Sequence, residues 1–173
     1  AGYRLFPISL NFSRSTVLEQ ELVEHIDRVC DTYGVAHHLI EIEITETIVF
    51  ENPEMFMDII TQIHQAGFTC SMDDFGSGYS SLNLLKDIQV DALKLDRAFF
   101  ADAEMRESRG KDIISTVIEL AKKLKMETVA EGIETMPQVE FLRSTDCDLV
   151  QGFVFAKPVP AGEFEALAFA KQR

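Results

Sequence analysis

The chain has 173 residues, of which 46% are hydrophobic and 26% are charged, so its composition is that of a globular protein with enough apolar residues for one core. This composition excludes a disordered tail, a collagen-like fibre and a small disulfide-stapled protein. Sixteen Lys and Arg against 29 Asp and Glu give a formal net charge of −13, which argues against a nucleic-acid polymer as the partner, since affinity for the phosphate backbone comes mainly from basic side chains.

The cysteines and the apolar segments indicate the cell compartment in which this segment lies. Cys30, Cys70 and Cys147 are odd in number and far apart, so we expect buried, free thiols in a reducing cytoplasm. No apolar run approaches 18 residues and no signal-peptide pattern opens the chain, which predicts no membrane contact by this segment. The chain begins with Ala1 rather than Met, which would fit either a processed protein or a piece of a longer one, and a longer parent protein could be membrane-anchored through other regions.

Short β-rich runs alternate with helical periods six times along the chain. The clearest strand pattern is at residues 39–45, where isoleucines alternate with Glu41, Glu43 and Thr45. The six expected strands are residues 6–11, 39–45, 68–72, 92–95, 128–130 and 148–151. Strands and helices that alternate at this spacing indicate βα units and a mostly parallel sheet, and both a doubly wound open sheet and a (β/α)₈ barrel fit the pattern.

Caps and apolar faces mark the helices that follow these strands. Thr16-x-x-Glu19 is a capping box that begins the first helix, Asn52-Pro53 begins the second, and Thr135-x-x-Gln138 caps the helix after the fifth strand. A short helix is expected near 81–86, and the polar stretch 102–110 is expected to be an exposed loop. The inner helix faces are expected to carry Leu18, Leu22, Ile26 and Val29, then Phe56, Ile59 and Ile63, then Ile113, Val117, Leu120 and Leu124, and, in a closing helix near 161–170, Phe164, Leu167 and Ala168.

Each expected strand has a polar residue near its carboxyl end, about one βα unit from the next. These residues are Asn11, Glu43, Asp73, Asp74, Lys94, Glu131 and Gln151. Taken one at a time, each has an ordinary explanation: Glu43 would lie on the wet face of a strand, the two aspartates would form a turn, and Lys94 would be a surface residue. In a parallel barrel or an open α/β sheet, however, these positions converge on the edge where ligands bind.

Together these side chains have the chemistry of a site for hard cations with a lysine beside it. Carboxylate and amide oxygens suit Mg²⁺ or Mn²⁺ better than zinc or copper. The adjacent Asp73 and Asp74 could serve two ions, and a pair of ions is the apparatus of phosphoester hydrolysis, because it stabilises both the attacking and the leaving oxygen.

At these residues the chain resembles the EAL-domain family, bacterial phosphodiesterases that linearise cyclic di-GMP to pGpG. The motifs that carry the resemblance follow one another in the family's order: residues 8–13, Glu43-Ile44-Thr45-Glu46-Thr47, Asp73-Asp74-Phe75-Gly76-Ser77-Gly78, Lys94-Leu95-Asp96, Ala130-Glu131-Gly132-Ile133-Glu134, and Gln151-Gly152-Phe153 through Lys157-Pro158. The resemblance covers essentially the whole chain and implies a TIM-like (β/α) barrel.

The resemblance also implies a role for each matching residue. The metal ligands would be Asn11, Glu43, Asp73, Asp74 and Glu131, holding two Mg²⁺ or Mn²⁺ ions in the complete domain. Lys94 would hold the nucleophilic water, and Glu131 would also be the general base. Gln151 and Glu134 would meet the substrate, and Glu46 would anchor the Asp-Asp-Phe-Gly loop. The loop at residues 73–81 is expected to take part in homodimerisation.

The chain departs from the family pattern at its start. The Glu-Ala-Leu signature of the family, which supplies a further metal ligand, lies upstream of the Asn11 motif, before this chain begins. Glu165-Ala166-Leu167 spells the same letters in the last helix, and we interpret it as chance. We therefore expect residues 1–173 to be the C-terminal portion of a single phosphodiesterase domain, with about six of eight βα units, and to hydrolyse cyclic di-GMP weakly or not at all by itself.

Two alternatives stay open. The chain could come from a catalytically incompetent EAL domain that binds cyclic di-GMP and signals to a partner. It could also be a different metal-dependent barrel enzyme of the enolase sort, which also uses strand-end carboxylates and a lysine, although the Asp-Asp-Phe-Gly-Ser-Gly and Gln-Gly-Phe motifs disfavour this.

Overall fold

The computed structural model describes residues 5–17, 19, 21–51, 53–77, 82–101 and 108–169. The strands are β1 (Ile8–Asn11), β2 (Ile40–Thr45), β3 (Thr69–Phe75), β4 (Ala92–Leu95), β5 (Glu127–Ala130) and β6 (Leu149–Val150). The helices are α1 (Arg14–Val17), α2 (Leu22–Tyr33), α3 (Glu46–Glu51), α4 (Pro53–Gln65), α5 (Leu82–Asp87), α7 (Ser108–Lys123), α8 (Met136–Ser144) and α9 (Ala161–Phe169). Two short 3₁₀ helices are η1 (His37–Leu39) and η2 (Arg97–Phe100).

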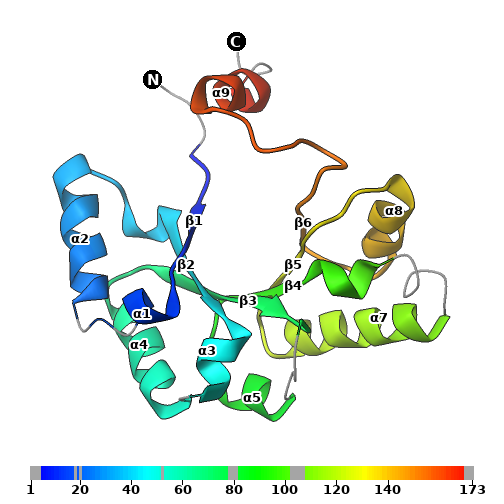
Figure 1. The fold of residues 1–173 in the computed structure, drawn as a ribbon, viewed down its shortest axis with the longest axis horizontal. Helices are drawn as coiled ribbons and strands as arrows, with labels where there is room; N and C mark the ends of the chain where they lie inside the picture. The colour runs from blue at the N-terminus through cyan, green and yellow to red at the C-terminus, as the bar shows by residue number, and fades with distance from the viewer. Residues whose placement is uncertain are drawn as a thin grey trace.

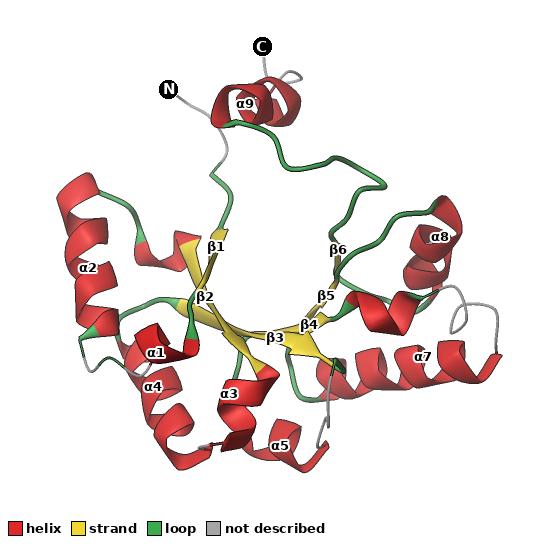
Figure 2. Ribbon diagram, in the orientation of Figure 1, coloured by secondary structure: helices red, strands yellow, loops and turns green. Residues whose placement is uncertain are grey.

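The six strands form one parallel sheet whose spatial order is the order of the sequence, β1-β2-β3-β4-β5-β6. A doubly wound sheet would reverse its direction at a switch point, so this order selects the barrel over the open sheet that the sequence also allowed. The sheet curls into half of a TIM-like barrel with helices on its outer, convex side (Figures 1 and 2). Helix α9 lies across the open side, between β1 and β6 (Figure 1).

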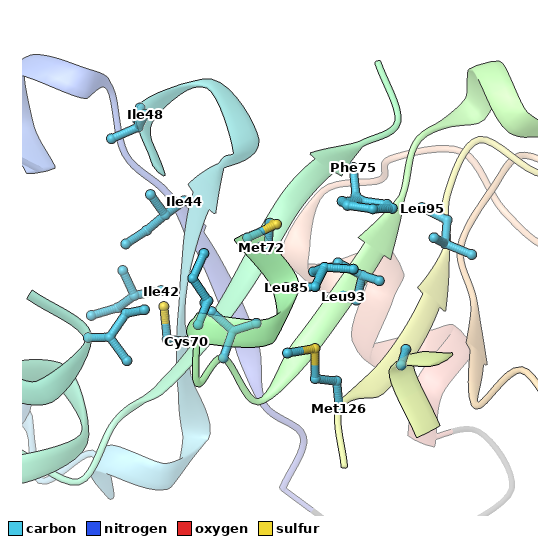
Figure 3. Close-up of a cluster of buried hydrophobic side chains, with 14 of the residues drawn as sticks. Ile42, Ile44, Ile48, Cys70, Met72, Phe75, Leu85, Leu93, Leu95 and Met126 are labelled. Carbon is cyan, nitrogen blue, oxygen red and sulfur yellow. The ribbon is translucent and has the colours of Figure 1, made fainter. Parts of the chain in front are cut away.

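The core lies between the convex face of the sheet and the helices. Alternation along the strands directs Ile42, Ile44, Met72 and Leu93 toward that side, and all four are fully buried (Figure 3). The residues between them face the concave side, where Glu41 accepts hydrogen bonds from the hydroxyls of Ser9 and Ser71, each at 2.9 Å. The inside of the half-barrel is therefore lined by polar groups.

The capping box predicted at Thr16-x-x-Glu19 does not begin the long first helix. Thr16 lies inside the single turn α1, whose start is capped by Ser13: the Ser13 hydroxyl accepts a 3.3 Å hydrogen bond from Thr16 N and lies 2.8 Å from Thr16 Oγ1. The long helix α2 begins only at Leu22, after a turn. Leu18, expected on its inner face, lies outside the described residues, and so does Asn52, the cap predicted for α4.

Helix α7 begins earlier than predicted and turns a different face to the core. It starts at Ser108, so the end of the stretch expected as an exposed loop is helical, while residues 102–107 lie outside the described part of the chain. Ile113 is 47% exposed, and the buried positions include Ile114, Val117 and Ile118. In α4, Phe56 and Ile63 are buried as predicted, but the buried residue between them is Ile60 and not Ile59.

The closing helix α9 does not pack inward as predicted. Phe164 is 50% exposed and Leu167 is 66% exposed. Its sequence is apolar on most sides, so periodicity did not indicate a true inner face. The helix contacts the start of the chain instead, where the rings of Phe6 and Phe169 lie 6.0 Å apart.

One partly exposed carboxylate, that of Asp148, ties the last strand to the rest of the sheet. Asp148, just before β6, accepts hydrogen bonds from the Thr128 amide at 2.8 Å and the Thr128 hydroxyl at 2.9 Å, and it pairs with Lys122 of α7. Burial alone would raise the pKa of Asp148, but the hydrogen bonds from Lys122 and Thr128 bring the pKa below its ordinary value. Asp148 therefore joins α7, β5 and β6.

The cysteines match the expectation in part. Cys30 and Cys70 are buried free thiols, as predicted, whereas Cys147 is only half-buried. Among the described helices, none is both long enough and apolar enough to cross a lipid bilayer.

Candidate functional site

The strand-end residues singled out in the sequence lie along the carboxyl edge of the sheet. Strand register places Asn11 beside Glu43, and Thr45, the last residue of β2, beside Asp73. Lys94 is the third residue of β4. The other two follow strands: Glu131 comes directly after β5 and donates its amide to the Leu95 carbonyl at 3.0 Å, and Gln151 comes directly after β6.

Lys94 is the centre of a buried charge cluster. Lys94 and Glu43 are each only 4% exposed, and their ammonium and carboxylate groups form an ion pair. The Lys94 ammonium also lies 3.3 Å from a carboxylate oxygen of Glu131. Burial alone lowers the pKa of Lys94, but the hydrogen bond to Glu43 and the charges of Glu43, Glu131 and Asp73 together raise it above its ordinary value. The lysine is therefore a fixed cation among carboxylates.

The carboxylates of the cluster exceed the positive charge available to them. Burial raises the pKa of Asp73, and the charges of Glu43 and Asp74 raise it further, against the lowering effects of the Asp74 amide and Lys94. Burial also raises the pKa of Glu131, where Asp73 and Glu43 again add to the effect and Lys94 opposes it. One ammonium thus faces several close carboxylates, an arrangement that favours a further cation.

The two aspartates leave the sheet through a local irregularity. Strand β3 runs three residues beyond its predicted end, to Phe75, and its pairing with β4 shifts register between Met72 and Phe75. Asp74 has a φ of 57°, in the left-handed region that few residues other than glycine adopt, and its amide donates to Asp73 Oδ1 at 2.9 Å. In a regular strand the side chains of adjacent residues point to opposite faces, and this irregularity relaxes that alternation at the two aspartates.

Glu46 holds the chain after these aspartates. It is the first residue of α3, directly after β2, and is only 6% exposed. Its Oε2 accepts a hydrogen bond from the Gly76 amide at 3.1 Å, so the contact with the Asp-Asp-Phe-Gly segment that the sequence suggested is present. Gly76 has a φ of 93°, and a Cβ at this position would lie 1.9 Å from Phe99 Cε2, so any other residue would adopt a strained backbone and displace the Phe99 ring.

Gln151 and Glu134 lie apart from the charge cluster, at a cavity of about 380 Å³. Both side chains are exposed to solvent. The cavity is also lined by Arg97, which the sequence interpretation missed, although its position three residues after Lys94 is a signal that could have found it. Lys157 lines the same cavity, so it offers two cationic side chains to an anionic ligand.

The oxygen donors of these side chains have the chemistry that suits a hard divalent cation, but they do not lie close together around one point. Among the described residues, no three His, Cys, Asp or Glu side chains form a ready-made metal cluster. Glu43 and Glu131 are instead turned toward Lys94. Asn11 is exposed at the end of the edge strand β1.

Comparison with known proteins gives a consistent result. A family model described as the EAL domain matches residues 2–158. The cyclic di-GMP phosphodiesterase NbdA of Pseudomonas aeruginosa is 35% identical over 165 residues, which are 95% of this chain but 21% of NbdA. The chain therefore spans about a fifth of the length of that relative.

Two solved structures show the same fold. The crystal structure of the EAL domain of Mycobacterium smegmatis DcpA superposes with a TM-score of 0.87 at 34% identity, covering 96% of this chain and 74% of that one. Klebsiella pneumoniae BlrP1, solved as a manganese/cy-diGMP complex at pH 9.0, superposes with a TM-score of 0.79 at 29% identity, covering 88% of this chain and 39% of that one.

Proposed function

Because this chain belongs to the EAL-domain family, we propose that it is the C-terminal portion, residues 1–173, of a domain that hydrolyses cyclic di-GMP to linear pGpG with Mg²⁺ or Mn²⁺. The observation that carries the proposal is the buried cluster of Lys94, Glu43, Asp73 and Glu131 at the carboxyl edge of the half-barrel. A relative with the same fold has been solved with manganese and cyclic di-GMP together, which supports both the metal and the substrate.

The chain's own oxygen donors would hold the metal. These are Asn11, Glu43, Asp73, Asp74 and Glu131, all on one edge of the sheet. Two bound divalent ions would supply Lewis-acid activation of water and neutralise the charge that develops on the phosphodiester. The excess of carboxylates over ammonium groups in the cluster is the feature that favours such ions.

The other side chains would position the reactants. Lys94 would hold the attacking water by donating to it, and Glu131 would accept the proton. Glu134 and Gln151 would contact the nucleotide in the cavity they line. Glu46 would keep Asp73 and Asp74 in place through its hydrogen bond to Gly76.

The test is a cyclic di-GMP cleavage assay on the longer parent protein with Mn²⁺, in which pGpG is identified by mass spectrometry. Glu131→Gln should lower kcat by about 10²-fold or more, the usual range for loss of a general base. Glu127→Gln is the matched control, since Glu127 lies at the opposite end of the same strand, and it should retain activity. Absence of pGpG from the unaltered parent protein would refute the proposal.

The second candidate is a domain that binds cyclic di-GMP without cleaving it. The observation that favours it for the isolated chain is the open side of the half-barrel: within the part of the chain that the structure describes, six strands border the site. Calorimetry with Ca²⁺ and cyclic di-GMP that shows binding, together with no pGpG in Mn²⁺, would select this candidate. Homodimerisation through residues 73–81, of which 78–81 lie outside the described residues, and a cytoplasmic setting stay predictions.

A further inference from the structure

Gln138 makes more contacts than the helix cap for which its spacing was noticed. It lies in the first turn of α8 and is only 8% exposed. Its Oε1 accepts a hydrogen bond from Thr135 N at 2.9 Å, which belongs to the predicted capping box, and another from Thr135 Oγ1 at 3.0 Å. Gln138 makes two further hydrogen bonds to residues outside the capping box: Oε1 also accepts from Glu134 N at 3.0 Å, and Nε2 donates to the Phe100 carbonyl at 2.7 Å.

These two further bonds connect different loops of the candidate site. Phe100 is the last residue of η2, which follows β4 and contains Arg97, whereas Glu134 belongs to the loop after β5. Arg97 and Glu134 both line the cavity described above. The Gln138 side chain thus joins two walls of that cavity, and a helix cap alone would not require the bond to Phe100.

The loops after β4 and β5 pack closely against each other and against the loop after β6. A Cβ on Gly132 would lie 2.4 Å from Arg97 Cβ, so the backbone after β5 runs directly against η2. The Ile133 amide donates to the Gln151 carbonyl at 3.1 Å, and the Ile133 carbonyl accepts from Val154 N at 3.1 Å. The loops after β4, β5 and β6 therefore form one connected unit, and a displacement of the β5 loop is transmitted to the loop that carries Gln151.

We propose that Gln138 is a positioning residue: its amide fixes the loop of residues 131–134 against η2 and so sets the shape of the cavity between Arg97, Glu134 and Gln151. The inference rests on the proposed function in one respect only, that the cavity receives part of the dinucleotide. Because Gln138 bonds to the cavity side of the loop, at Glu134, its loss should weaken substrate binding more than the chemical step.

The variant Gln138→Glu distinguishes the helix-capping role of Gln138 from its hydrogen bond to Phe100. A glutamate keeps the oxygen that accepts from Thr135 and Glu134, but it presents a second oxygen to the Phe100 carbonyl in place of the donor. Loss of one buried hydrogen bond corresponds to roughly a tenfold change in an equilibrium. Thr135→Ala is the matched control, since it removes a member of the capping box and leaves the bond between Gln138 and Phe100 in place.

The experiment combines steady-state kinetics of the parent protein on cyclic di-GMP with amide hydrogen exchange followed by NMR. Gln138→Glu should raise KM about tenfold with kcat within about threefold, and should speed exchange of the Ile133 and Val154 amides about tenfold. Thr135→Ala should lower the melting temperature and leave KM and both exchange rates unchanged. If Gln138→Glu does not fold, Gln138→Met, which keeps the volume and removes every hydrogen bond, takes its place.

Each outcome decides between positioning and capping. Unchanged KM and unchanged exchange in the Gln138 variant would show a helix cap only and overturn the proposal, as would a change in only one of the two readouts. If the unaltered protein does not cleave cyclic di-GMP, the proposed function fails; the proposal is then judged by exchange together with calorimetric binding of cyclic di-GMP, and unchanged values in either overturn it.

Discussion

Replacing Lys94 by methionine should expose the electrostatic cost of the buried carboxylates. Lys94 is 4% exposed and is paired with the equally buried Glu43, while Glu131 is the more accessible partner at 3.3 Å. Removal of one member of a buried ion pair typically costs about 3–5 kcal/mol, because the remaining charge is left without compensation. We expect Lys94→Met to lose this much unfolding free energy in the absence of divalent cations.

Urea denaturation at pH 7 measures the effect directly. If the unfolding free energy falls by about 2 kcal/mol per M urea, the expected loss lowers the midpoint of urea unfolding by roughly 1.5–2.5 M. The double variant Glu43→Gln/Lys94→Met should recover most of it, since no buried carboxylate at position 43 then lacks its partner. Lys123→Met is the control, because Lys123 pairs with Glu119 on the surface of α7 and both side chains are largely exposed; its midpoint should stay at the wild-type value.

Two results would refute this reasoning. A Lys94→Met protein as stable as the wild type would show that Glu43 is not dependent on the ammonium group. A double variant no more stable than the single one would show that the loss comes from packing around the lysine stem and not from the uncompensated charge.

Three other predictions follow from the contacts described above. Asp148→Asn should cost about 1.5–3 kcal/mol at neutral pH, the range for hydrogen bonds to a charged group. The pKa of Asp148 is lowered in the folded state, so this stabilisation is present above the unfolded pKa of about 3.9 and is lost as the pH falls through the folded pKa. The melting temperatures of the wild type and of Asp148→Asn should therefore converge in acid. A constant difference between them would contradict the prediction. Gly76→Ala should lower the melting temperature more than Gly34→Ala, since both glycines have positive φ but only position 76 has Phe99 in the way; equal losses would exclude the Phe99 contact as a cause. Chelation with EDTA should abolish pGpG formation by the parent protein and added Mn²⁺ should restore it, whereas full activity in EDTA would exclude the proposed metal dependence.

The alternation of strands and helices could be predicted from sequence because each strand carries its own signal. In β2 the isoleucines at 42 and 44 are buried on one side while Glu41 and Glu43 face the other, and this period of two is visible in the letters alone. Placement of the polar residues at one edge followed from the parallel topology, which was also predictable from the βα spacing.

The helix faces could be predicted only approximately. Two apolar stripes share Val117 in α7, one through Ile113 and the other through Ile114, and both have helical spacing. Only the position of the sheet under the helix decides between them. The cap predicted at Thr16 was wrong for a local reason: Thr16 lies within the turn α1, and the hydroxyl of Ser13 accepts the hydrogen bond that caps this turn.

The ion pairs and hydrogen bonds inside the candidate site could not be predicted from the sequence. The ion pair of Glu43 and Lys94 joins β2 to β4, two strands apart, and depends on sheet register that no local pattern records. Gln138 was predicted as a cap from its spacing to Thr135, but its bond to Phe100 spans 38 residues and became visible only in three dimensions.

The sequential order of the sheet also bears on how the chain is made. Every described strand pairs with the next strand in sequence, which begins about 20 to 35 residues later, so no pairing waits for a distant part of the chain. At synthesis rates of roughly 5–20 residues per second, each new strand emerges from the ribosome within about 1–7 seconds of its partner. The half-barrel can therefore grow one βα unit at a time, and during growth the newest strand edge is the surface most exposed to aggregation.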